Sequence, residues 1–427
     1  MSILLGCIAD DFTGATDLAN NLVRHGMRVA QTIGIPVSKI EAELDCVVVA
    51  LKSRTIPPEE AIRQSLDALH WLLEQGAQQI YFKYCSTFDS TPIGNIGPVT
   101  EALMKALKTN FTIATPAFPD NGRTVFKGHL FVGNLLLSES GMRNHPLTPM
   151  TDANLVRVMQ AQSKGLVDLI DYQVVARGEK AIHAQIEKLK ASNVSIAIVD
   201  AISNDDLYLM GPAFKDLPLV TGGSGLAIGL PKNFGIEADS RASTLPLANG
   251  YEAILSGSCS EASNQQVNHF IESGGSSYAI NPSDLMIKEY GVQATVMDAL
   301  TWAKPLLSLG PVLIYSTASP DTVKRVQAEL SIQDLGCAIE NTLAMIAKEL
   351  VNMGVGKLII AGGETSGACV QALGVEQMQI GPQIEPGVPW CHARVNQQSL
   401  HLALKSGNFG GPEFFIKAFS VLREQSS

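Results

Sequence analysis

The sequence predicts an α/β protein of two domains, each with a mostly parallel sheet flanked by helices. Short apolar runs of strand length alternate with helical segments, and polar or glycine-rich turns follow most of the runs. A length of 427 residues is long for one hydrophobic core and therefore favours two domains. Apolar residues make up 46% of the chain and charged residues 17%, which suits strands buried on both faces.

The composition argues against several classes of function. A net charge of −10 without runs of Lys or Arg disfavours general binding of nucleic acid, because phosphate backbones need clustered cations. The apolar runs are shorter than the roughly 18 residues of a membrane helix, and the first run leads directly into Asp10 and Asp11 without a basic leader. We therefore expect a cytoplasmic protein that does not bind membranes. The seven cysteines lack CxxC spacing, which indicates reduced thiols and no metal site.

The first predicted strand, residues 3–9, ends at the motif DDFTGATD, and a helix over 14–25 follows it. Asp10, Asp11 and Thr13 then lie at the carboxyl end of this strand, the edge at which open α/β sheets bind their ligands. Adjacent carboxylates repel each other unless a hydroxyl-rich ligand, a cation or helix N–H groups offset the repulsion. A helix cap by Asp11 or Thr13 explains one acid but not both. We therefore interpret Asp10 and Asp11 as catalytic residues.

Strands and helices continue to alternate through the first half, and polar residues gather where the strands end. We predict strands over 28–33, 46–51, 79–83 and 111–115, with helices over 58–74 and 95–108. The carboxyl ends of parallel strands meet at one edge of the sheet, so these polar residues should face the two acids. The residues expected to bind a substrate there are Thr13, Lys52, Arg54, Lys83, Asp89, Ser90 and Thr91.

Cations beside hydroxyls and carboxylates are what a small polyhydroxy acid requires. Arg54 can grip a carboxylate with two hydrogen bonds, and Lys52 or Lys83 adds charge. Asp and Ser side chains can bind the hydroxyls. Each of these residues alone is also typical of a solvated loop. The evidence is their joint placement at successive strand ends.

The remaining segments of the first half are less specific. Residues 115–127 form a loop rich in Pro and Gly, and a hairpin is expected around Gly128, as part of a lid or of a contact in a homodimer. A glycine cluster at 222–225 is a weak signal by itself. Residues 231–250 lack periodicity and are assigned to a linker. The predicted domains are therefore residues 1–235 and 250–427.

The stretch KLIIAGGETSGACV, residues 357–370, is typical of a strand, a tight turn and a helix N-terminus. Gly362 and Gly363 let the backbone approach a ligand closely, and Thr365 or Ser366 can cap a helix that begins at Gly367. Free N–H groups and the helix dipole there favour a phosphate, although an ordinary strand-to-helix turn has the same pattern.

Two further turns of the second half have similar chemistry. Residues 252–255 form a strand that leads into SGSCS, where Ser256, Gly257 and Ser258 can contact phosphate. A strand over 400–404 leads into KSGNFGG, residues 405–411. Three such turns on one sheet edge can surround a nucleotide. Neither GxxxxGK[ST] nor GxGxxG occurs, which argues against a P-loop protein and a dinucleotide-binding one.

With these motifs in order, the chain resembles the four-carbon acid sugar kinases and, among them, the 3-oxo-tetronate 4-kinases. The motifs are DDFTGATD, LKSR, YFKYCSTFDST with GNIGPV, VTGGSGL, LSGSCS, AGGETS and ALKSGNFG. They extend over almost the whole chain. Many relatives have an Arg-Gly pair after the DST segment, whereas here Pro92, Ile93 and Gly94 follow Thr91. This departure matches the 3-oxo-tetronate branch. It does not identify which cation binds the acid group of the substrate.

The resemblance implies an N-terminal domain that binds the acid sugar, a C-terminal domain that binds the nucleotide, and an active site in the cleft between them. It implies ATP-dependent phosphorylation of the 4-hydroxyl of a 3-dehydro-tetronate such as 3-dehydro-L-erythronate. By similarity, Ser258, the stretch 362–365 and Gly407 contact ATP. The full set of residues expected at the nucleotide is Ser256, Ser258, Gly362, Gly363, Glu364, Thr365, Ser406 and Gly407.

Phosphoryl transfer needs mainly alignment and charge stabilisation from a protein. We expect backbone N–H groups of the glycine turns to hold the ATP phosphates while Mg²⁺ offsets their charge. Asp10 or Asp11 would orient the 4-hydroxyl and take its proton, with Asp89 as the reserve base. Two alternatives stay open: an NAD-dependent oxidoreductase of small hydroxy acids, and a sensor that binds the acid sugar without turnover.

Overall fold

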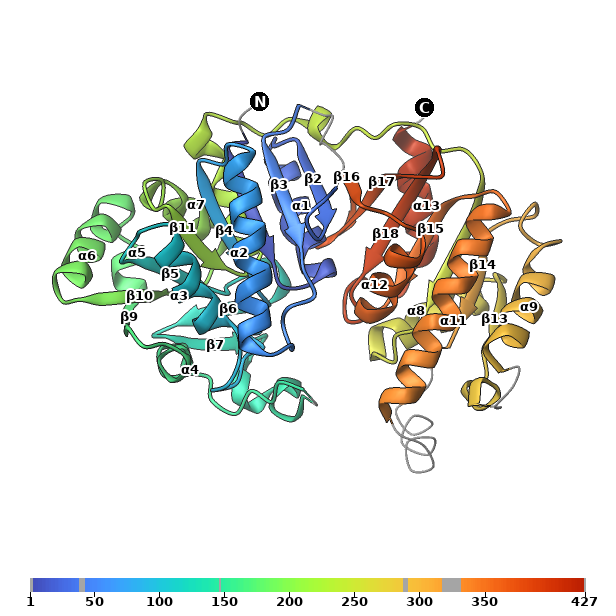
Figure 1. Cartoon of the computed structure of the whole chain (residues 1–427), viewed down its shortest axis with the longest axis horizontal. Coiled ribbons are helices and arrows are strands. Elements are labelled where there is room, and N and C mark those ends of the chain that lie inside the picture. The colour runs from blue at the N-terminus through green and yellow to red at the C-terminus, as the bar shows by residue number, and fades with distance from the viewer. Residues whose placement is uncertain (1–2, 38–42, 146, 287–290, 317–331, 426–427) are drawn as a thin grey trace. The chain divides into compact units, whose positions relative to one another are not determined.

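The computed structural model describes residues 3–37, 43–145, 147–286, 291–316 and 332–425 (Figure 1). The chain divides into two compact units, residues 1–243 and 244–427, and each is described by itself. Both contain a mostly parallel sheet flanked by helices, which confirms the predicted α/β class. Within the described ranges, no helix is both long enough and apolar enough to cross a membrane.

The sheet of the first unit is parallel throughout its described strands. Its order is β2-β3-β1-β4-β11-β5-β10-β9, so that β1 lies between β3 and β4. All residues of β1 are buried, as its continuous apolar sequence requires for a strand covered on both faces. The strands are β1 (Leu5–Ala9), β2 (Val29–Ile33), β3 (Cys46–Ala50), β4 (Gln79–Lys83), β5 (Thr112–Thr115), β9 (Leu166–Ile170), β10 (Val194–Val199) and β11 (Leu219–Gly222).

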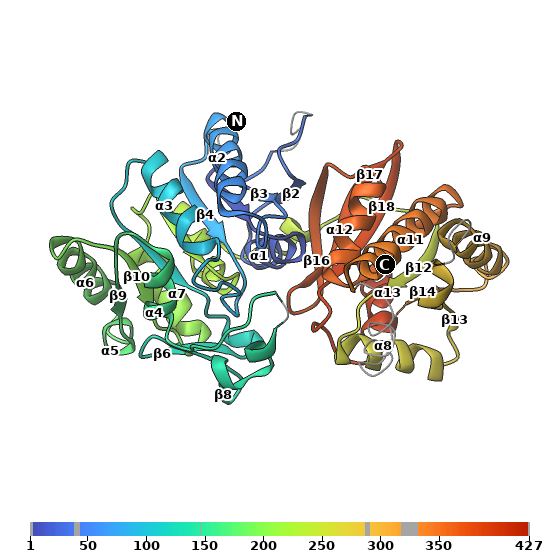
Figure 2. The same cartoon turned by 60° about the horizontal axis from the view of Figure 1, so that its bottom comes forward.

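Helices cover both faces of this sheet. Figure 2 shows α2 and α3 on one face and α1 and α7 on the other. Asn154 caps α4, and its side chain accepts a hydrogen bond from the N–H of Arg157 at 3.0 Å. The helices are α1 (Phe12–Arg24), α2 (Pro58–Glu74), α3 (Ile96–Ala106), α4 (Leu155–Gln162), α5 (Tyr172–Val175), α6 (Glu179–Ala191) and α7 (Asn204–Ala213).

A small antiparallel sheet is inserted after β5. It consists of β6 (Arg123–Phe126), β7 (His129–Val132) and β8 (Leu135–Leu136). Lys127 and Gly128 connect β6 to β7 with φ angles of 51° and 71°, the left-handed pair that two-residue hairpins favour. The hairpin expected around Gly128 is therefore present.

The second unit combines parallel and antiparallel strands. Its order is β13-β14-β12-β15-β18-β17-β16, and only the pairs β18–β17 and β17–β16 are antiparallel among the described strands. The antiparallel strands contain Pro382 and Pro389 and are joined by a turn with Gly387, residues that usually indicate loops. The strands are β12 (Tyr251–Ser256), β13 (Ser276–Ala279), β14 (Val312–Tyr315), β15 (Val355–Ala361), β16 (Gln377–Glu385), β17 (Val388–Val395) and β18 (Gln398–Lys405).

Helices also cover the two faces of this sheet, with α9, α11 and α12 on one side and α8 and α13 on the other (Figure 2). The core on the α13 side includes Trp390 and Phe419, and the indole N–H of Trp390 donates to the carbonyl oxygen of Ala418 at 2.7 Å. The described helices are α8 (Glu261–Glu272), α9 (Gly291–Ala303), α11 (Ile332–Asn352), α12 (Gly363–Ala372) and α13 (Phe414–Gln425).

Candidate active site

The carboxyl ends of β1, β3 and β4 bring together most of the polar residues predicted in the first unit. The N–H of Asp10 donates to the carbonyl oxygen of Lys83 at 3.1 Å, and the N–H of Ser53 donates to that of Asp10 at 3.0 Å. These backbone bonds align the three strand ends. The side chains that follow them therefore start from the same level of the sheet.

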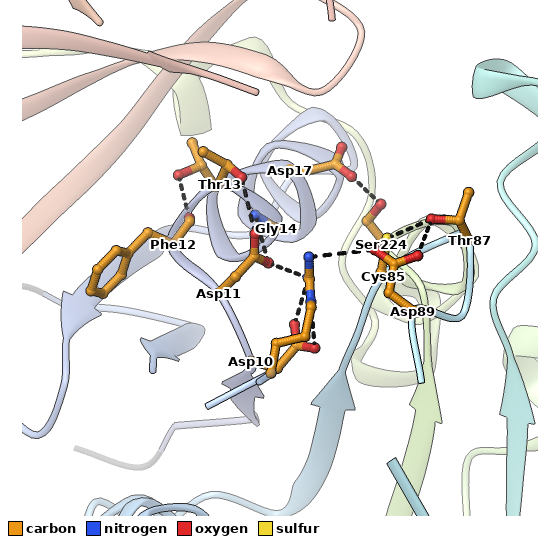
Figure 3. Close-up of polar contacts among 12 residues, drawn as sticks. Asp10, Asp11, Phe12, Thr13, Gly14, Asp17, Cys85, Thr87, Asp89 and Ser224 are labelled. Carbon is orange, nitrogen blue, oxygen red and sulfur yellow. Dashed lines mark hydrogen bonds and ion pairs between the residues drawn. The ribbon is translucent and has the colours of Figure 1, made fainter. Parts of the chain in front are cut away.

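Asp11 is the N-cap of α1, which begins at Phe12 rather than at Gly14. Its carboxylate accepts hydrogen bonds from the N–H of Gly14 and from the hydroxyl of Thr13, both at 3.1 Å (Figure 3). The cap holds the carboxylate at the positive end of the helix dipole. Thr13 thus contacts Asp11 directly.

Arg54 joins the two acids. Its guanidinium donates to Asp10 through Nε at 2.9 Å and through Nη2 at 2.8 Å, and Nη2 also donates to Asp11 at 2.8 Å. Burial raises the pKa of Asp10, whereas at Asp11 the charges of Arg54 and Lys83 outweigh burial and lower the pKa. The two-bonded grip expected between Arg54 and a substrate carboxylate is made here with the carboxylate of Asp10.

Asp89 lies on the other side of the guanidinium, with its Oδ2 3.8 Å from Nη1 of Arg54. The hydroxyl of Thr87 donates to Oδ1 of Asp89 at 2.6 Å. The amide of Asn95 donates to the carbonyl oxygens of Ser53 and Arg54 at 2.8 and 3.2 Å, which fixes the loop that carries Arg54. A small pocket is lined by Asp10, Ser53, Arg54, Phe82, Asp89, Ser90, Asn95, Ile96 and Val99.

Two of the predicted substrate residues, Lys52 and Thr91, do not line this pocket, and Ser90 lines it with its hydroxyl engaged by the protein. The buried hydroxyl of Ser90 donates to the side chain of Gln162 at 3.0 Å, and Gln162 donates to the carbonyl oxygen of Thr91 at 2.8 Å. These contacts anchor the 90–91 segment to α4. Lys52 is exposed.

Lys83 ends β4 and is only 3% exposed. An atom added as Cβ on Gly14 would lie 2.5 Å from Lys83 Nζ and 2.2 Å from an oxygen of Asp11. The absence of a side chain at Gly14 therefore makes room for the ammonium group beside the acid. The Lys83 ammonium donates no hydrogen bond within the part of the chain that the structure describes.

Two residues of this site were missed by sequence reasoning. Asp17 is 5% exposed, and the hydroxyl of Ser224 donates to its carboxylate (Figure 3). Burial raises the pKa of Asp17 to about 6, although the charge of Lys83 opposes this change. Both residues belong to motifs that carry the family resemblance, DDFTGATD and VTGGSGL, which was the available signal.

In the second unit, β12, β15 and β18 are neighbours and end at the same level. Ser256 lies opposite Ala361, and Ala361 lies opposite Lys405. The N–H of Gly362 donates to the carbonyl oxygen of Lys405 at 2.8 Å, and the N–H of Gly257 donates to that of Ala361 at 3.0 Å. The three glycine-rich turns therefore follow adjacent strand ends.

The turn after β15 leads directly into α12. Gly362 is the N-cap with a φ of 125°, which favours glycine, and no side chain caps the helix. The helix begins at Gly363, so the expected cap by Thr365 or Ser366 is wrong, and both residues lie in the first turn. A Cβ on Gly257 would lie 2.3 Å from the hydroxyl oxygen of Thr365, so the two turns pack closely. The first N–H groups of α12 have no partner within the helix and can bind an anion.

Serine side chains join the turn after β12 to the turn after β18. The hydroxyl of Ser260 donates to the carbonyl oxygen of Gly407 at 2.6 Å, and the hydroxyl of Ser258 donates to Ser260 at 3.1 Å. Ser256 is fully buried at the end of β12, whereas Ser258 and Ser406 are partly exposed. Gly363 and Glu364 are exposed at the start of α12.

The side chain of Lys405 donates hydrogen bonds to the turn that follows β18. Its buried ammonium donates to the carbonyl oxygens of Ser406 and Gly407 at 2.9 Å and of Phe409 at 3.1 Å. Burial lowers the pKa of Lys405 to about 7, although the charge of Glu385 opposes this change. Among the described residues, no group of three or more His, Cys, Asp or Glu side chains has metal-binding geometry.

Comparisons with known proteins also divide the chain into two parts. Residues 5–230 match the model of a family described as the sugar-binding N-terminal domain, and residues 253–415 match a nucleotide-binding C-terminal domain. A 3-oxo-tetronate kinase of Pseudomonas savastanoi pv. phaseolicola is 55% identical, over 98% of this chain and 97% of that protein. A 3-oxo-tetronate kinase of Burkholderia multivorans is 54% identical over the same shares of the two chains.

Two solved structures are also similar. One is a Salmonella typhimurium LT2 protein described as a tRNA synthase, with a TM-score of 0.88 and 44% identity over 97% of this chain and 98% of that one. The other is a Haemophilus influenzae protein with a TM-score of 0.79 and 44% identity over 97% and 99% of the two chains.

Proposed function

Because the chain belongs to the family of 3-oxo-tetronate kinases, we propose that it transfers the γ-phosphoryl group of ATP to the 4-hydroxyl of a 3-oxo-tetronate. The substrates considered are 3-dehydro-L-erythronate and 3-dehydro-D-erythronate, and the products are the 4-phosphate and ADP. The observation that carries the proposal is the similarity to such kinases over nearly the full length of both proteins. Each of the two substrates, the acid sugar and ATP, then has a candidate binding site in this chain.

The first unit is proposed to bind the acid sugar. Arg54 is engaged by two carboxylates of the protein, so Lys83 is the better placed cation for the carboxylate of the substrate. The Asp11 side chain is 27% exposed and that of Asp10 is 7% exposed, which makes Asp11 the more accessible acid. In this proposal Asp11 orients the 4-hydroxyl and accepts its proton, while Asp10 holds Arg54 in place. Asp89 remains the reserve base.

The second unit is proposed to bind ATP. The uncapped N-terminus of α12 and the N–H of Ser258 would bind the triphosphate, since the N–H groups of Gly257 and Gly362 already donate to Ala361 and Lys405. Ser258, Thr365 and Ser406 add hydroxyls around them. No carboxylate cluster for Mg²⁺ is found in the described ranges, so the ATP phosphates would supply most of its ligands, as is usual for this ion. When bound, Mg²⁺ would offset the charge on the phosphates.

The reaction is a direct displacement. The oxygen of the 4-hydroxyl forms a bond to the γ-phosphorus while the bond from that phosphorus to the β–γ bridging oxygen breaks, and ADP leaves with the electron pair. The hydroxyl proton passes to Asp11. The two bound substrates must meet for this transfer, so closure of the chain around them is part of the proposal.

An ADP-release assay over a panel of four-carbon acids tests the function. We expect ADP formation with a 3-oxo-tetronate and none with NAD in place of ATP. Asp11→Asn should lower kcat by at least about 100-fold. Binding of the acid without ADP release would favour the sensor, and thermal stabilisation by NAD but not by MgATP would favour the oxidoreductase.

A further inference from the structure

Asp17 is a buried acid with a hydrogen-bond partner on only one of its two carboxylate oxygens. Its side chain leaves α1 and meets the hydroxyl of Ser224, which donates to Oδ2 (Figure 3). The other oxygen, Oδ1, is buried and has no hydrogen-bond partner among the described residues. Asp11, in contrast, receives hydrogen bonds on both carboxylate oxygens. A buried carboxylate with an unpaired oxygen destabilises a fold unless a nearby charge compensates it.

The protein holds Ser224 firmly against this acid. The amide of Asn21 donates to the carbonyl oxygen of Ser224 at 3.0 Å, one helical turn beyond Asp17 on α1. A Cβ on Gly225 would lie 2.2 Å from the carbonyl oxygen of Ala117, so the glycine turn is packed tightly against the segment after β5. The close packing of this glycine turn therefore fixes the position of Ser224.

The charge that compensates Asp17 is that of Lys83. Lys83 Nζ lies near Gly14, and Gly14 is three residues before Asp17, so both positions share one face of α1. Lys83 lowers the pKa of Asp17 and of Asp11, which indicates that the ammonium interacts with both acids. Because the Lys83 ammonium donates no hydrogen bond to a described residue, the charges of these acids position it and its three N–H donors remain for a ligand.

We propose that Asp17 is a positioning residue that anchors the Lys83 ammonium for the carboxylate of the acid sugar, and that Ser224 fixes the orientation of Asp17. This inference rests on the proposed kinase function and deepens it. It assigns a role to two residues, Asp17 and Ser224, that would not themselves touch the substrate. It also explains why the protein retains a costly buried acid beside its substrate site.

Kinetics of the full-length chain with both substrates varied test the assignment. Asp17→Asn should raise KM for the acid sugar by at least about 10-fold and leave KM for ATP within about twofold, because only the acid-sugar site loses a charge that acts on Lys83. Ser224→Ala should act in the same direction with a smaller effect. The melting temperature of Asp17→Asn should not fall, because the unpaired charge is removed.

Asp206→Asn is the matched control. Asp206 is also a buried acid, but its carboxylate accepts hydrogen bonds from the N–H groups of Ile202 and Ser203, both at 2.9 Å, in the capping box of α7. Its variant should lower the melting temperature while KM for the acid sugar stays within about twofold. An unchanged KM in Asp17→Asn would overturn the inference.

A double-mutant cycle separates positioning from a general structural role. Lys83→Met should cost at least about 100-fold in kcat/KM for the acid sugar, and adding Asp17→Asn to it should cost less than about threefold more. The double variant should also melt at a higher temperature than Lys83→Met, because the acid left without its countercharge is gone. Additive losses in kcat/KM would overturn the inference.

The outcome is distinguishable from a failure of the proposed function. If the wild-type chain releases no ADP with any four-carbon acid, the kinase proposal fails. If the wild-type chain phosphorylates the acid sugar and Asp17→Asn does so with an unchanged KM for the acid sugar, only the role of Asp17 fails.

Discussion

The hydroxyl of Ser260 donates to the carbonyl oxygen of Gly407 at 2.6 Å, across 147 residues of sequence. Ser260 is also the N-cap of α8, where it accepts a hydrogen bond from the N–H of Ser263 at 3.2 Å. One side chain therefore closes a helix and joins the turn after β12 to the turn after β18. Both turns belong to the proposed ATP site.

Ser260→Ala should raise KM for ATP several-fold and leave KM for the acid sugar unchanged, because it separates the two turns without touching the first unit. Loss of the cap should also lower the unfolding free energy by about 1 kcal/mol. Steady-state kinetics and thermal melts measure the two effects. The matched control is Ser203→Ala, which removes the N-cap of α7 in the first unit and should lower stability alone. Equal effects of both variants on KM for ATP would contradict the assignment of the site.

Cys259 lies beside Ser258 in the turn after β12 and is exposed, which makes it a reporter of nucleotide binding. Saturating MgATP should slow its alkylation by iodoacetamide at least about fivefold by covering the turn. Cys337 in α11 is also exposed and is the internal control, because its rate should not change. Mass spectrometry of the two peptides measures both rates in one sample. Unprotected Cys259 at saturating ATP would show that the nucleotide binds elsewhere.

Gly14→Ala should lower kcat/KM for the acid sugar by at least about 10-fold while KM for ATP stays the same. The reason is steric: the new Cβ would lie 2.5 Å from Lys83 Nζ and 2.2 Å from Asp11 Oδ1, so both groups must move. Gly141→Ala is the control, since a Cβ there has no atom within 4 Å. If the two alanine variants have the same kinetics, neither Lys83 nor Asp11 acts in the acid-sugar site.

The stability difference between the wild-type protein and Asp17→Asn should depend on pH. Burial raises the pKa of Asp17 from 3.8 to about 6 in the folded protein, where Lys83, Arg123 and Asp11 are the charges that act on it. Between pH 4 and 6 the folded chain binds more protons than the unfolded chain, so the stability contributed by Asp17 falls as pH rises. Two pKa units correspond to about 3 kcal/mol. Asp17→Asn should therefore be more stable than the wild type at pH 7.5, by at most this amount, and the difference should vanish near pH 4.

Denaturant unfolding at pH 4, 5, 6 and 7.5 measures this dependence. Asp206→Asn is again the control, because the hydrogen bonds that its Oδ2 accepts in the capping box of α7 should make the wild type more stable than the variant at pH 7.5. A wild-type protein that gains stability over Asp17→Asn as pH rises would reverse the sign and contradict the prediction.

Local patterns in the sequence were sufficient to predict most of the parallel strands and the turns that follow them, although β9 and β13 were missed. β4 has the predicted bounds and β1 falls within the predicted range, because continuous apolar runs next to polar turns are a local signal. The antiparallel strands β16 and β17 were missed, because their prolines and the glycine between them resemble a loop.

The pairings within the candidate site required the structure. Ser224 and Asp17 are 207 residues apart, and no local periodicity connects them. Arg54 was interpreted as a cation for the substrate; in the structure it binds Asp10 and Asp11, because strand order brings the end of β3 next to the end of β1. The N-cap of α12 is Gly362 and not the predicted Thr365 or Ser366. Gly362 has a φ of 125°, and no side chain caps the helix.

The carbonyl oxygens of Ser406, Gly407 and Phe409 accept hydrogen bonds from the ammonium of Lys405, as backbone carbonyl oxygens of a K⁺ channel filter coordinate the ion in place of water. Here the cation is covalently attached to the loop that it organises. Residues 406–409 are therefore organised by a donor that belongs to the same chain and does not have to be taken up from the medium.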